Sequence, residues 1–350
     1  MKAFYRKYIL NFKKPGGTSR GILTQKESWL LVLRDKSNYG VGECAVFRGL
    51  SVDDTPDYEE RLKWVCENIY LGEEELLETL YAYPSLQLGI EQAFLSLKAE
   101  DPFILFPSDF TQKQAPIEIN GLIWMGQEES MRKQIDEKLE QGFQCIKMKI
   151  GALDFEKEMG LLREIRKLYT KEEVTLRVDA NGAFSKEEAK EKLKILAELD
   201  IHSIEQPIKP GNISAMKDLC DETPLPIALD EELIGVFGVT EKALLLQTIQ
   251  PQYIILKPSL VGGFAGCREW INLAEELGIG WWITSALESN IGLNAIAQWT
   301  FSLKNSLPQG LGTGSLFTNN FESPLVVENG ELCYKKERAW EPNLIEKLCI

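Results

Sequence analysis

The sequence predicts an α/β fold, a (β/α)7β TIM-like barrel preceded by an α+β domain. Five short apolar runs between residues 146 and 257 each end in a charged residue, at intervals of 25–30 residues. A strand, a crossover helix and two loops need about that length, as in a βαβ unit. Upstream of these runs, residues 1–115 show strands followed by helices, an order typical of a separate α+β domain.

The first region, residues 1–115, is expected to form this α+β domain. Apolar periodicity predicts strands at 3–10, 28–34 and 39–45, and helices at 57–69, 73–81 and 87–100. The glycine-rich connection at 15–21 has two interpretations that stay open. It is either the connection of a hairpin or a flexible lid that closes over a substrate.

Residues 116–317 alternate between strand and helix patterns and are expected to form the barrel. Strands are predicted at 116–120, 144–149, 174–179, 202–205, 226–230, 253–257, 280–284 and 308–311. Helices are predicted at 127–141, 155–168, 185–198, 212–220, 239–248, 263–277 and 290–303. Ser185 is the expected N-cap of one helix and Gly278 the expected stop of another. The tail, residues 318–350, contains two strand-like pieces around Asn329-Gly330 and is expected to complete the first domain.

Composition excludes several classes of function. The net charge of −14 argues against nucleic acid or an anionic membrane as a partner, since both favour a basic face. The chain has no apolar run of about 18 residues, and residues 1–12 lack the apolar core of a signal peptide. Seven scattered cysteines without a Cys-x-x-Cys pattern fit free thiols in a reducing compartment. A cytoplasmic location is therefore expected.

Three of the charged strand ends are carboxylates, at Asp179, Glu205 and Asp230. The carboxyl ends of barrel strands all face one mouth, where catalytic residues gather. A single carboxylate at a strand end is usually a helix cap or a turn residue, but three in consecutive strands are harder to explain in that way. Hard oxygen ligands with open positions suit Mg²⁺, so the sequence predicts a magnesium site, for which Mn²⁺ is a possible substitute.

Lysines lie on both sides of these carboxylates along the chain. Lys147 and Lys149 are two residues apart, so their side chains project from the same face of one strand. In the barrel interior the two ammonium groups are expected to lower the pKa of at least one of them, which makes a base. Solvation at a strand edge is the alternative, and the apolar neighbours argue against it. Lys257 ends a later strand and is expected on the opposite side, which suits proton abstraction next to a metal-bound carboxylate.

These motifs together resemble the enolase superfamily, in its muconate-lactonising subgroup. The stretches that carry the resemblance are Ile146–Gly151, Arg177–Gly182, Ile204–Pro207, Ala228–Glu231 and Leu256–Pro258. The resemblance covers nearly the whole chain and implies that the α+β domain caps the barrel. It assigns Asp179, Glu205 and Asp230 to Mg²⁺, Lys149 and Lys257 to the acid/base positions, and Lys147 to tuning Lys149.

Other stretches resemble one branch of this subgroup, whose members are carbon–oxygen lyases that dehydrate a cyclic hydroxycarboxylate. They are Gly40–Glu43, Gly49–Ser51, Pro84–Glu91, Ser285–Gly292 and Gly310–Gly314. The resemblance implies a small carboxylate substrate, contacted by Arg20, Asn181, Ser285, Gly312 and Thr313. The single histidine, His202, excludes the His–Asp dyad of mandelate-racemase-like relatives and is expected to be structural.

Two other functions stay open. Opposed lysines also suit a racemase of N-acylamino acids, a dipeptide epimerase or a lactonising enzyme of the same superfamily. Dipeptide epimerases of the subgroup carry an Asp-x-Asp where this chain has Gly312-Thr313-Gly314, which argues against them. The remoter alternative is a non-catalytic barrel that binds a ligand. The sequence does not fix the oligomeric state.

Overall fold

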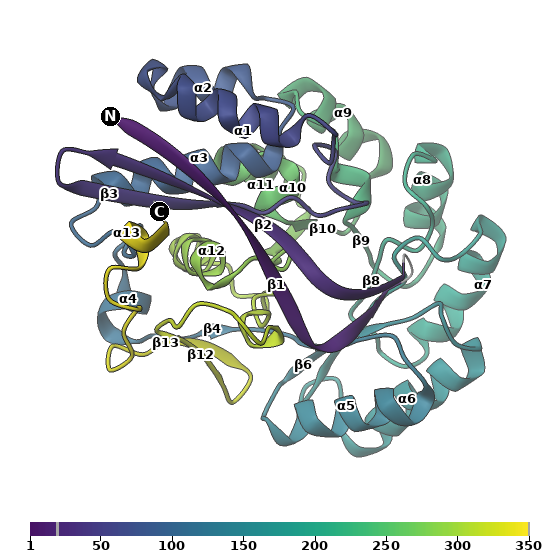
Figure 1. Ribbon diagram of the computed structural model, residues 1–350. Coiled ribbons are helices and arrows are strands. Elements are labelled where there is room, and N and C mark those ends of the chain that lie inside the picture. Colours follow the sequence, from purple (N-terminus) through teal and green to yellow (C-terminus); the bar gives the residue numbers. More distant parts are fainter. Residues whose placement is uncertain (19–20, 349–350) are drawn as a thin grey trace.

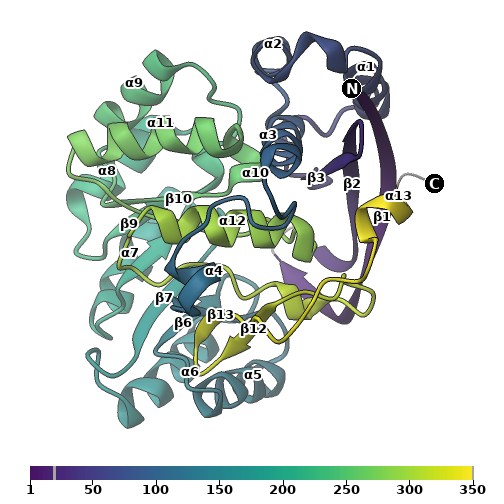
Figure 2. The same cartoon turned by 90° about the vertical axis from the view of Figure 1, so that its left-hand side faces the viewer.

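The computed structural model describes residues 1–18 and 21–348 of the chain. Its elements form two regions, an N-terminal sheet covered by helices and a parallel barrel (Figures 1 and 2). Within the described residues no helix is both long and apolar enough to cross a bilayer. The six cysteines in this part of the chain all have free thiols, as their spacing predicted.

The N-terminal region is built on an antiparallel sheet in the order β1-β2-β3. The strands are β1 (Lys2–Thr18), β2 (Gly21–Asp35) and β3 (Asn38–Cys44). The first two are longer than expected, because the glycine-rich segment belongs to the hairpin: Gly16 pairs with Leu23 and Gly17 with Ile22. Gly17 lies against the barrel, where a Cβ would be 2.2 Å from the carbonyl oxygen of Met125. The hairpin interpretation is therefore confirmed, and the hairpin crosses the front of the barrel in Figure 1.

Three helices pack on one face of this sheet. They are α1 (Tyr58–Glu67), α2 (Glu73–Thr79) and α3 (Pro84–Lys98), with a 3-10 turn, η1 (Ile69–Leu71), after α1. Helix α3 approaches β3 very closely, since a Cβ on Gly42 would lie 1.9 Å from the carbonyl oxygen of Gly89. Leu31, Leu62 and Ile90 are fully buried between these elements. A short helix, α4 (Asp109–Lys113), then leads to the barrel.

The barrel sheet contains seven parallel strands in sequence order. They are β5 (Gly121–Ile123), β6 (Cys145–Lys149), β7 (Thr175–Asp179), β8 (Ser203–Glu205), β9 (Ile227–Leu229), β10 (Tyr253–Leu256) and β11 (Gly280–Ile283). Helices follow them as α5 (Glu128–Glu140), α6 (Phe155–Leu168), α7 (Lys186–Ala197), α8 (Ile213–Glu222), α9 (Val239–Ile249), α10 (Pro258–Val261), α11 (Gly263–Glu276) and α12 (Asn290–Ser302). Ser185 caps α7 as predicted, in a capping box with Glu188. Gly278 follows α11 with a positive φ of 70°, which suits a helix stop.

The ends of the barrel differ from the sequence prediction. The predicted first strand at 116–120 is divided between two sheets, because the backbone of β4 (Ile117–Glu118) pairs with the C-terminal hairpin while Ile119 bridges to Gln309. The parallel sheet itself starts at β5. The expected eighth strand at 308–311 is reduced to two bridges, from Gln309 to Ile119 and from Gly310 to Thr284. These two bridges connect β11 back to the start of the barrel and close it.

The tail contacts both regions. Its hairpin, β12 (Leu325–Glu328) and β13 (Glu331–Tyr334), forms a small sheet with β4 beside the barrel. Helix α13 (Leu344–Leu348) instead packs on the second face of the N-terminal sheet, against Leu30, Val32 and Val41. Figure 2 shows α13 beside β1 and β2. The domain boundaries at residues 115 and 317 stay a prediction.

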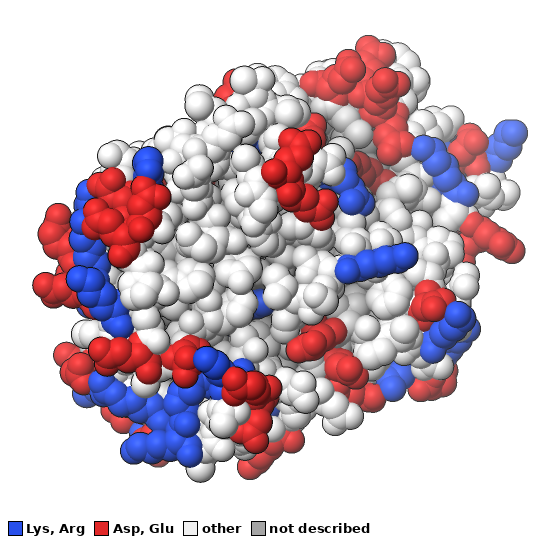
Figure 3. All heavy atoms as spheres, turned by 180° about the vertical axis from the view of Figure 1, so that it is seen from behind, with Lys and Arg blue, Asp and Glu red and all other residues white. Residues whose placement is uncertain are grey.

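Charged side chains are mixed on the face seen in Figure 3. Lys and Arg alternate with Asp and Glu around its edge, and few charges lie in the middle. The described residues form no continuous basic area on that side, in line with the acidic composition.

Candidate active site

The strand ends bring the predicted charged residues together at one mouth of the barrel. Lys149, Asp179 and Glu205 lie side by side in register on β6, β7 and β8. Asp230 and Lys257 each follow the next strands by one residue. The apolar residues between them pack outward beneath the helices, so the charged side chains point inward, as strand alternation requires.

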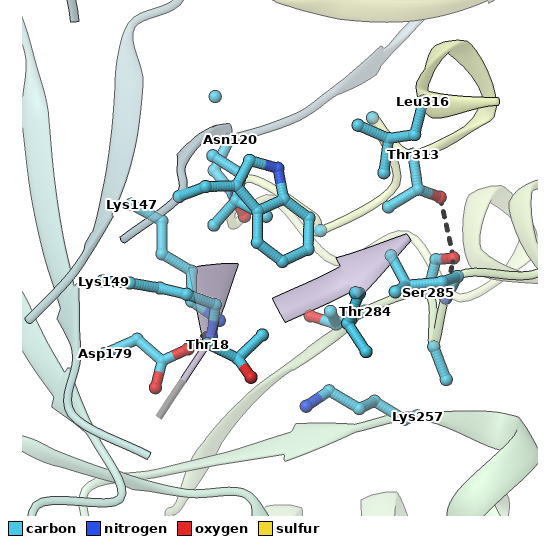
Figure 4. A pocket seen from close by; sticks show the side chains of 18 of the residues that line it. Thr18, Asn120, Lys147, Lys149, Asp179, Lys257, Thr284, Ser285, Thr313 and Leu316 are labelled. Atoms are coloured by element: carbon cyan, nitrogen blue, oxygen red, sulfur yellow. Dashed lines mark hydrogen bonds and ion pairs between the residues drawn. The ribbon is translucent and has the colours of Figure 1, made fainter. Parts of the chain in front are cut away.

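Ion pairs connect these buried groups. Lys149 Nζ lies 2.7 Å and Lys147 Nζ 3.1 Å from Asp179 Oδ2. Lys147 also contacts Glu205 Oε2, and Lys257 contacts Asp230 Oδ2 and lies 3.9 Å from Glu205 Oε1. Lys147 and Lys149 therefore approach the carboxylates from β6, and Lys257 approaches from β10, as Figure 4 shows for Asp179 and the three lysines.

The carboxylates perturb one another strongly. Burial raises the pKa of Glu205 to about 8, and the nearby charges of Asp179 and Asp230 add to this effect. Burial acts on Asp179 too, but the ammonium groups of Lys147 and Lys149 outweigh it and hold the pKa of Asp179 well below its usual range. The site thus contains one carboxylate that is poorly compensated and one that is well compensated.

The expectation of a lowered pKa for at least one of Lys147 and Lys149 is not met at Lys147. Burial alone lowers the pKa of Lys147, yet Asp179 and Glu205 raise it above its ordinary value. The pKa of Lys257 is raised as well, because Asp230 and Glu205 outweigh burial. At Lys147 the attraction of Asp179, Glu205 and Asp230 exceeds the repulsion expected from Lys149. Lys257 is therefore held as an ammonium group.

The donor set has the chemistry of a divalent-cation site. Glu205 is buried, and its charged contacts in the site are Lys147 at Oε2 and the more distant Lys257 at Oε1. Within the described residues no three His, Cys, Asp or Glu side chains converge as metal ligands do. The reason is that Asp179, Glu205 and Asp230 turn oxygens toward lysine ammonium groups. Three buried carboxylates at neighbouring strand ends supply the oxygen ligands that a hard cation prefers.

A cavity of about 190 Å³ lies over this cluster. The three lysines and Asp179 line its floor, and Thr18 and Leu23 of the β1–β2 hairpin contribute to its cover. The side walls are largely apolar and include Phe47, Trp124, Leu287 and Leu316. Sequence reasoning did not identify these wall residues, because each comes from a different loop.

Four of the five predicted substrate-binding residues lie at the cavity. Asn181, Ser285, Gly312 and Thr313 all line it. Asn181 has a φ of 44° and accepts a hydrogen bond from Lys149 Nζ at 2.6 Å, so its oxygen faces the base. Arg20 lies outside the described residues.

A buried carboxylate behind the cavity was missed. Glu288 accepts hydrogen bonds from Ser285 and Ser259 and has no exposed surface. It lies within the stretch Ser285–Gly292, which the sequence singled out, but its partner Ser259 comes from α10, 29 residues earlier in the chain. His202 stacks with Tyr253 at the other end of the barrel and is structural, as predicted.

Comparisons with known proteins agree with this geometry. Residues 130–337 match the family model described as enolase C-terminal domain-like. The o-succinylbenzoate synthase of Desulfotalea psychrophila is 44% identical over 363 residues, which cover 95% of this chain and 98% of that protein. The crystal structure of MenC from Desulfotalea psychrophila superposes with a TM-score of 0.84 at 41% identity, covering 95% of this chain and 99% of that one.

A more distant relative is also similar over most of its length. The L-Ala-D/L-Glu epimerase of Bacillus subtilis is 28% identical and covers 92% of this chain and 88% of that protein. The chain therefore belongs to the enolase superfamily and, within it, to the o-succinylbenzoate synthase family.

Proposed function

We propose that this protein is an o-succinylbenzoate synthase of menaquinone biosynthesis. It eliminates water from 2-succinyl-6-hydroxy-2,4-cyclohexadiene-1-carboxylate in the syn sense and releases 2-succinylbenzoate. The observation that carries the proposal is the placement of Lys149 and Lys257 on separate strands, both facing the same carboxylate cluster under an apolar cavity. The 44% identity to the Desulfotalea psychrophila enzyme supports the choice of substrate.

Asp179, Glu205 and Asp230 would hold Mg²⁺, and Mn²⁺ suits the same oxygen ligands. When bound, the cation supplies positive charge to the substrate carboxylate and so favours the enediolate that forms on proton loss. The burial of all three carboxylates at adjacent strand ends supports this assignment.

The lysines have separate roles in the elimination. Neutral Lys149 Nζ takes the proton from the ring carbon that carries the carboxylate. The resulting ammonium group then gives a proton to the departing 6-hydroxyl on the same face of the ring, so one C–H and one C–O bond break and water leaves an aromatic ring. Lys257 remains protonated, consistent with its raised pKa, and stabilises the enediolate from the other face.

Other groups prepare the base and exclude water. Lys147 lies between Asp179 and Glu205 and places a fixed positive charge near Lys149. Asn181 accepts a hydrogen bond from Lys149 Nζ and so fixes its orientation. The hairpin, Trp124 and Leu316 cover the ring, which strengthens these charge interactions. Arg20, close in sequence to Thr18, stays our candidate for the succinyl carboxylate.

The alternative is a racemase or epimerase of N-acylamino acids. Two opposed lysines can transfer a proton from one face of a carbon to the other, and the Bacillus subtilis relative is an epimerase. Gly312-Thr313-Gly314 argues against a dipeptide, because no carboxylate is present there for its amino group. Exchange of the α-proton in D₂O from both enantiomers of an N-succinylamino acid would favour this alternative.

Absorbance-monitored turnover of the cyclohexadiene carboxylate tests the proposal, first with Mg²⁺ and then with excess EDTA. We expect rapid aromatisation that EDTA abolishes and added Mg²⁺ restores. Absence of turnover in a protein that still shows a Mg²⁺-dependent thermal shift would refute the synthase and leave the racemase. Absence of both would point to a non-catalytic barrel.

A further inference from the structure

A line of buried polar side chains runs from the cavity wall into the protein. Thr313 Oγ1 lies 2.8 Å from Ser285 Oγ, which lies 2.6 Å from Glu288 Oε2. Ser259 contacts the other oxygen of Glu288 from α10. Only Thr313 and Ser285 line the cavity, and all four residues are at most 8% exposed. Figure 4 shows the contact between Thr313 and Ser285 on the side of the cavity opposite Lys147 and Lys149.

Counting protons fixes the direction of these hydrogen bonds. A hydroxyl has one proton and two lone pairs, and an ionised carboxylate has only acceptors. With Glu288 ionised, Ser285 donates to Glu288, and its oxygen accepts from Thr313 and from the backbone amide of Leu287 at 3.1 Å. Ser285 then has no hydrogen-bonding capacity left. Thr313 has used its only proton, so it offers the cavity lone pairs alone.

The direction of these hydrogen bonds depends on the charge of Glu288, which its surroundings control. The pKa of Glu288 is raised, because burial and the carboxylate of Glu43 on β3 together outweigh the hydrogen bonds from Ser259 and Ser285, which lower it. Lys26 on β2 is the buried cation of this region and is attracted to both carboxylates. Its Nζ donates to the carbonyl oxygen of Val46 at 2.8 Å. With Lys26 protonated, the ionised form of Glu288 has a countercharge.

We propose that Glu288 is a positioning residue that makes the Thr313 wall of the cavity a hydrogen-bond acceptor. Such a wall favours a ligand that presents a hydroxyl or an N–H group there and disfavours a carboxylate or a carbonyl oxygen. The succinyl carboxylate is therefore directed away from Thr313, toward the β1–β2 hairpin. This inference depends on the proposed function only for its ligand, since 2-succinylbenzoate at neutral pH has acceptors and no donors.

Binding of 2-succinylbenzoate to a set of four proteins tests the proposal by calorimetry. The variants are Thr313→Val, Glu288→Leu and the double variant, each compared with the wild type in the presence of Mg²⁺. With Glu288 intact, Thr313→Val should change Kd by less than about 2-fold, because the hydroxyl donates nothing to the ligand. In the Glu288→Leu background Thr313 is free to donate, and Thr313→Val should weaken binding by about 3- to 10-fold.

A 3-fold or greater loss of affinity from Thr313→Val alone would overturn the proposal, since Thr313 would then donate to the ligand. Neutron diffraction supplies a readout that needs no ligand, turnover or second variant. The deuterium on Thr313 Oγ1 is expected to point to Ser285, and its pointing into the cavity would contradict the assignment. Failure of the wild type to aromatise the cyclohexadiene, with this deuterium position observed, would refute the proposed function and leave this inference standing.

Discussion

Replacement of Lys149 is the sharpest test of the catalytic assignment. A positioned general base contributes about 10²- to 10⁴-fold to a rate, or about 3–5 kcal/mol of the barrier. The fold should lose much less. Asp179 keeps Lys147 as a partner at 3.1 Å when Lys149 is removed, so the lost hydrogen bond accounts for about 1–3 kcal/mol of stability. Lys149→Ala is therefore expected to lower kcat by at least about 100-fold and Tm by only a few degrees.

Two control variants separate charge from proton transfer. Lys149→Arg retains a cation beside Asp179 but cannot act as a base near neutral pH, so turnover should be lost in this variant too. Lys242 is an equally buried lysine that pairs with Glu269 at 2.7 Å between α9 and α11. Lys242→Met should lower stability and leave the turnover of the folded enzyme unchanged. Retention of more than a few per cent of wild-type turnover by Lys149→Ala would refute the base assignment.

Three further predictions concern charge and packing. Glu205→Gln should abolish the Tm increase that Mg²⁺ gives the wild type, because a neutral amide is a weaker ligand for a hard cation than a carboxylate. An unchanged Mg²⁺ response in a thermal scan would count against the metal assignment. Burial raises the pKa of Glu91 to about 7, so the folded state keeps a proton that the unfolded state loses between pH 4.5 and 7. Stability should therefore fall by up to about 3 kcal/mol relative to Glu91→Gln as pH rises through this range, and parallel urea-unfolding profiles for the two proteins would contradict this. Gly42→Ala should destabilise the protein by about 2 kcal/mol or more, since its Cβ would meet a carbonyl oxygen of α3. Gly160→Ala on α6 has open space around its Cβ and should stabilise the protein. Urea unfolding of both variants measures the difference, and equal midpoints would be inconsistent with the close contact at Gly42.

The barrel could be predicted because its signal is local and repeated. The strands β6 to β10 are fully or largely buried, so their sequences contain mostly apolar residues. The charged residue at the carboxyl end of each strand indicates which end of the barrel holds the site. Lys149, Asp179 and Glu205 lie in register, as their regular spacing predicted. The same regularity was absent where the prediction was wrong. The first barrel strand was predicted too early in the chain, because the backbone of β4 pairs with β13, which lies more than 200 residues away in the sequence.

The electrostatics could not be predicted from neighbours in sequence. Lys147 and Lys149 project from the same face of β6, and this pair alone suggests a lowered pKa for one of them. The carboxylates that raise the pKa of Lys147 come from β7 and β8 and act only in the folded barrel. Glu288 was missed for a related reason: Ser259 and Ser285 are ordinary polar residues in sequence, and only burial shows that their protons are committed.

A crystal structure with Mg²⁺ and 2-succinylbenzoate is the most direct test of the central claim. We predict that the ring carboxylate lies over Asp179, Glu205 and Asp230, with Lys149 and Lys257 on opposite faces of the ring and the succinyl carboxylate toward the hairpin. A ring bound away from Lys149, or with both lysines on one face, would contradict the proposed elimination.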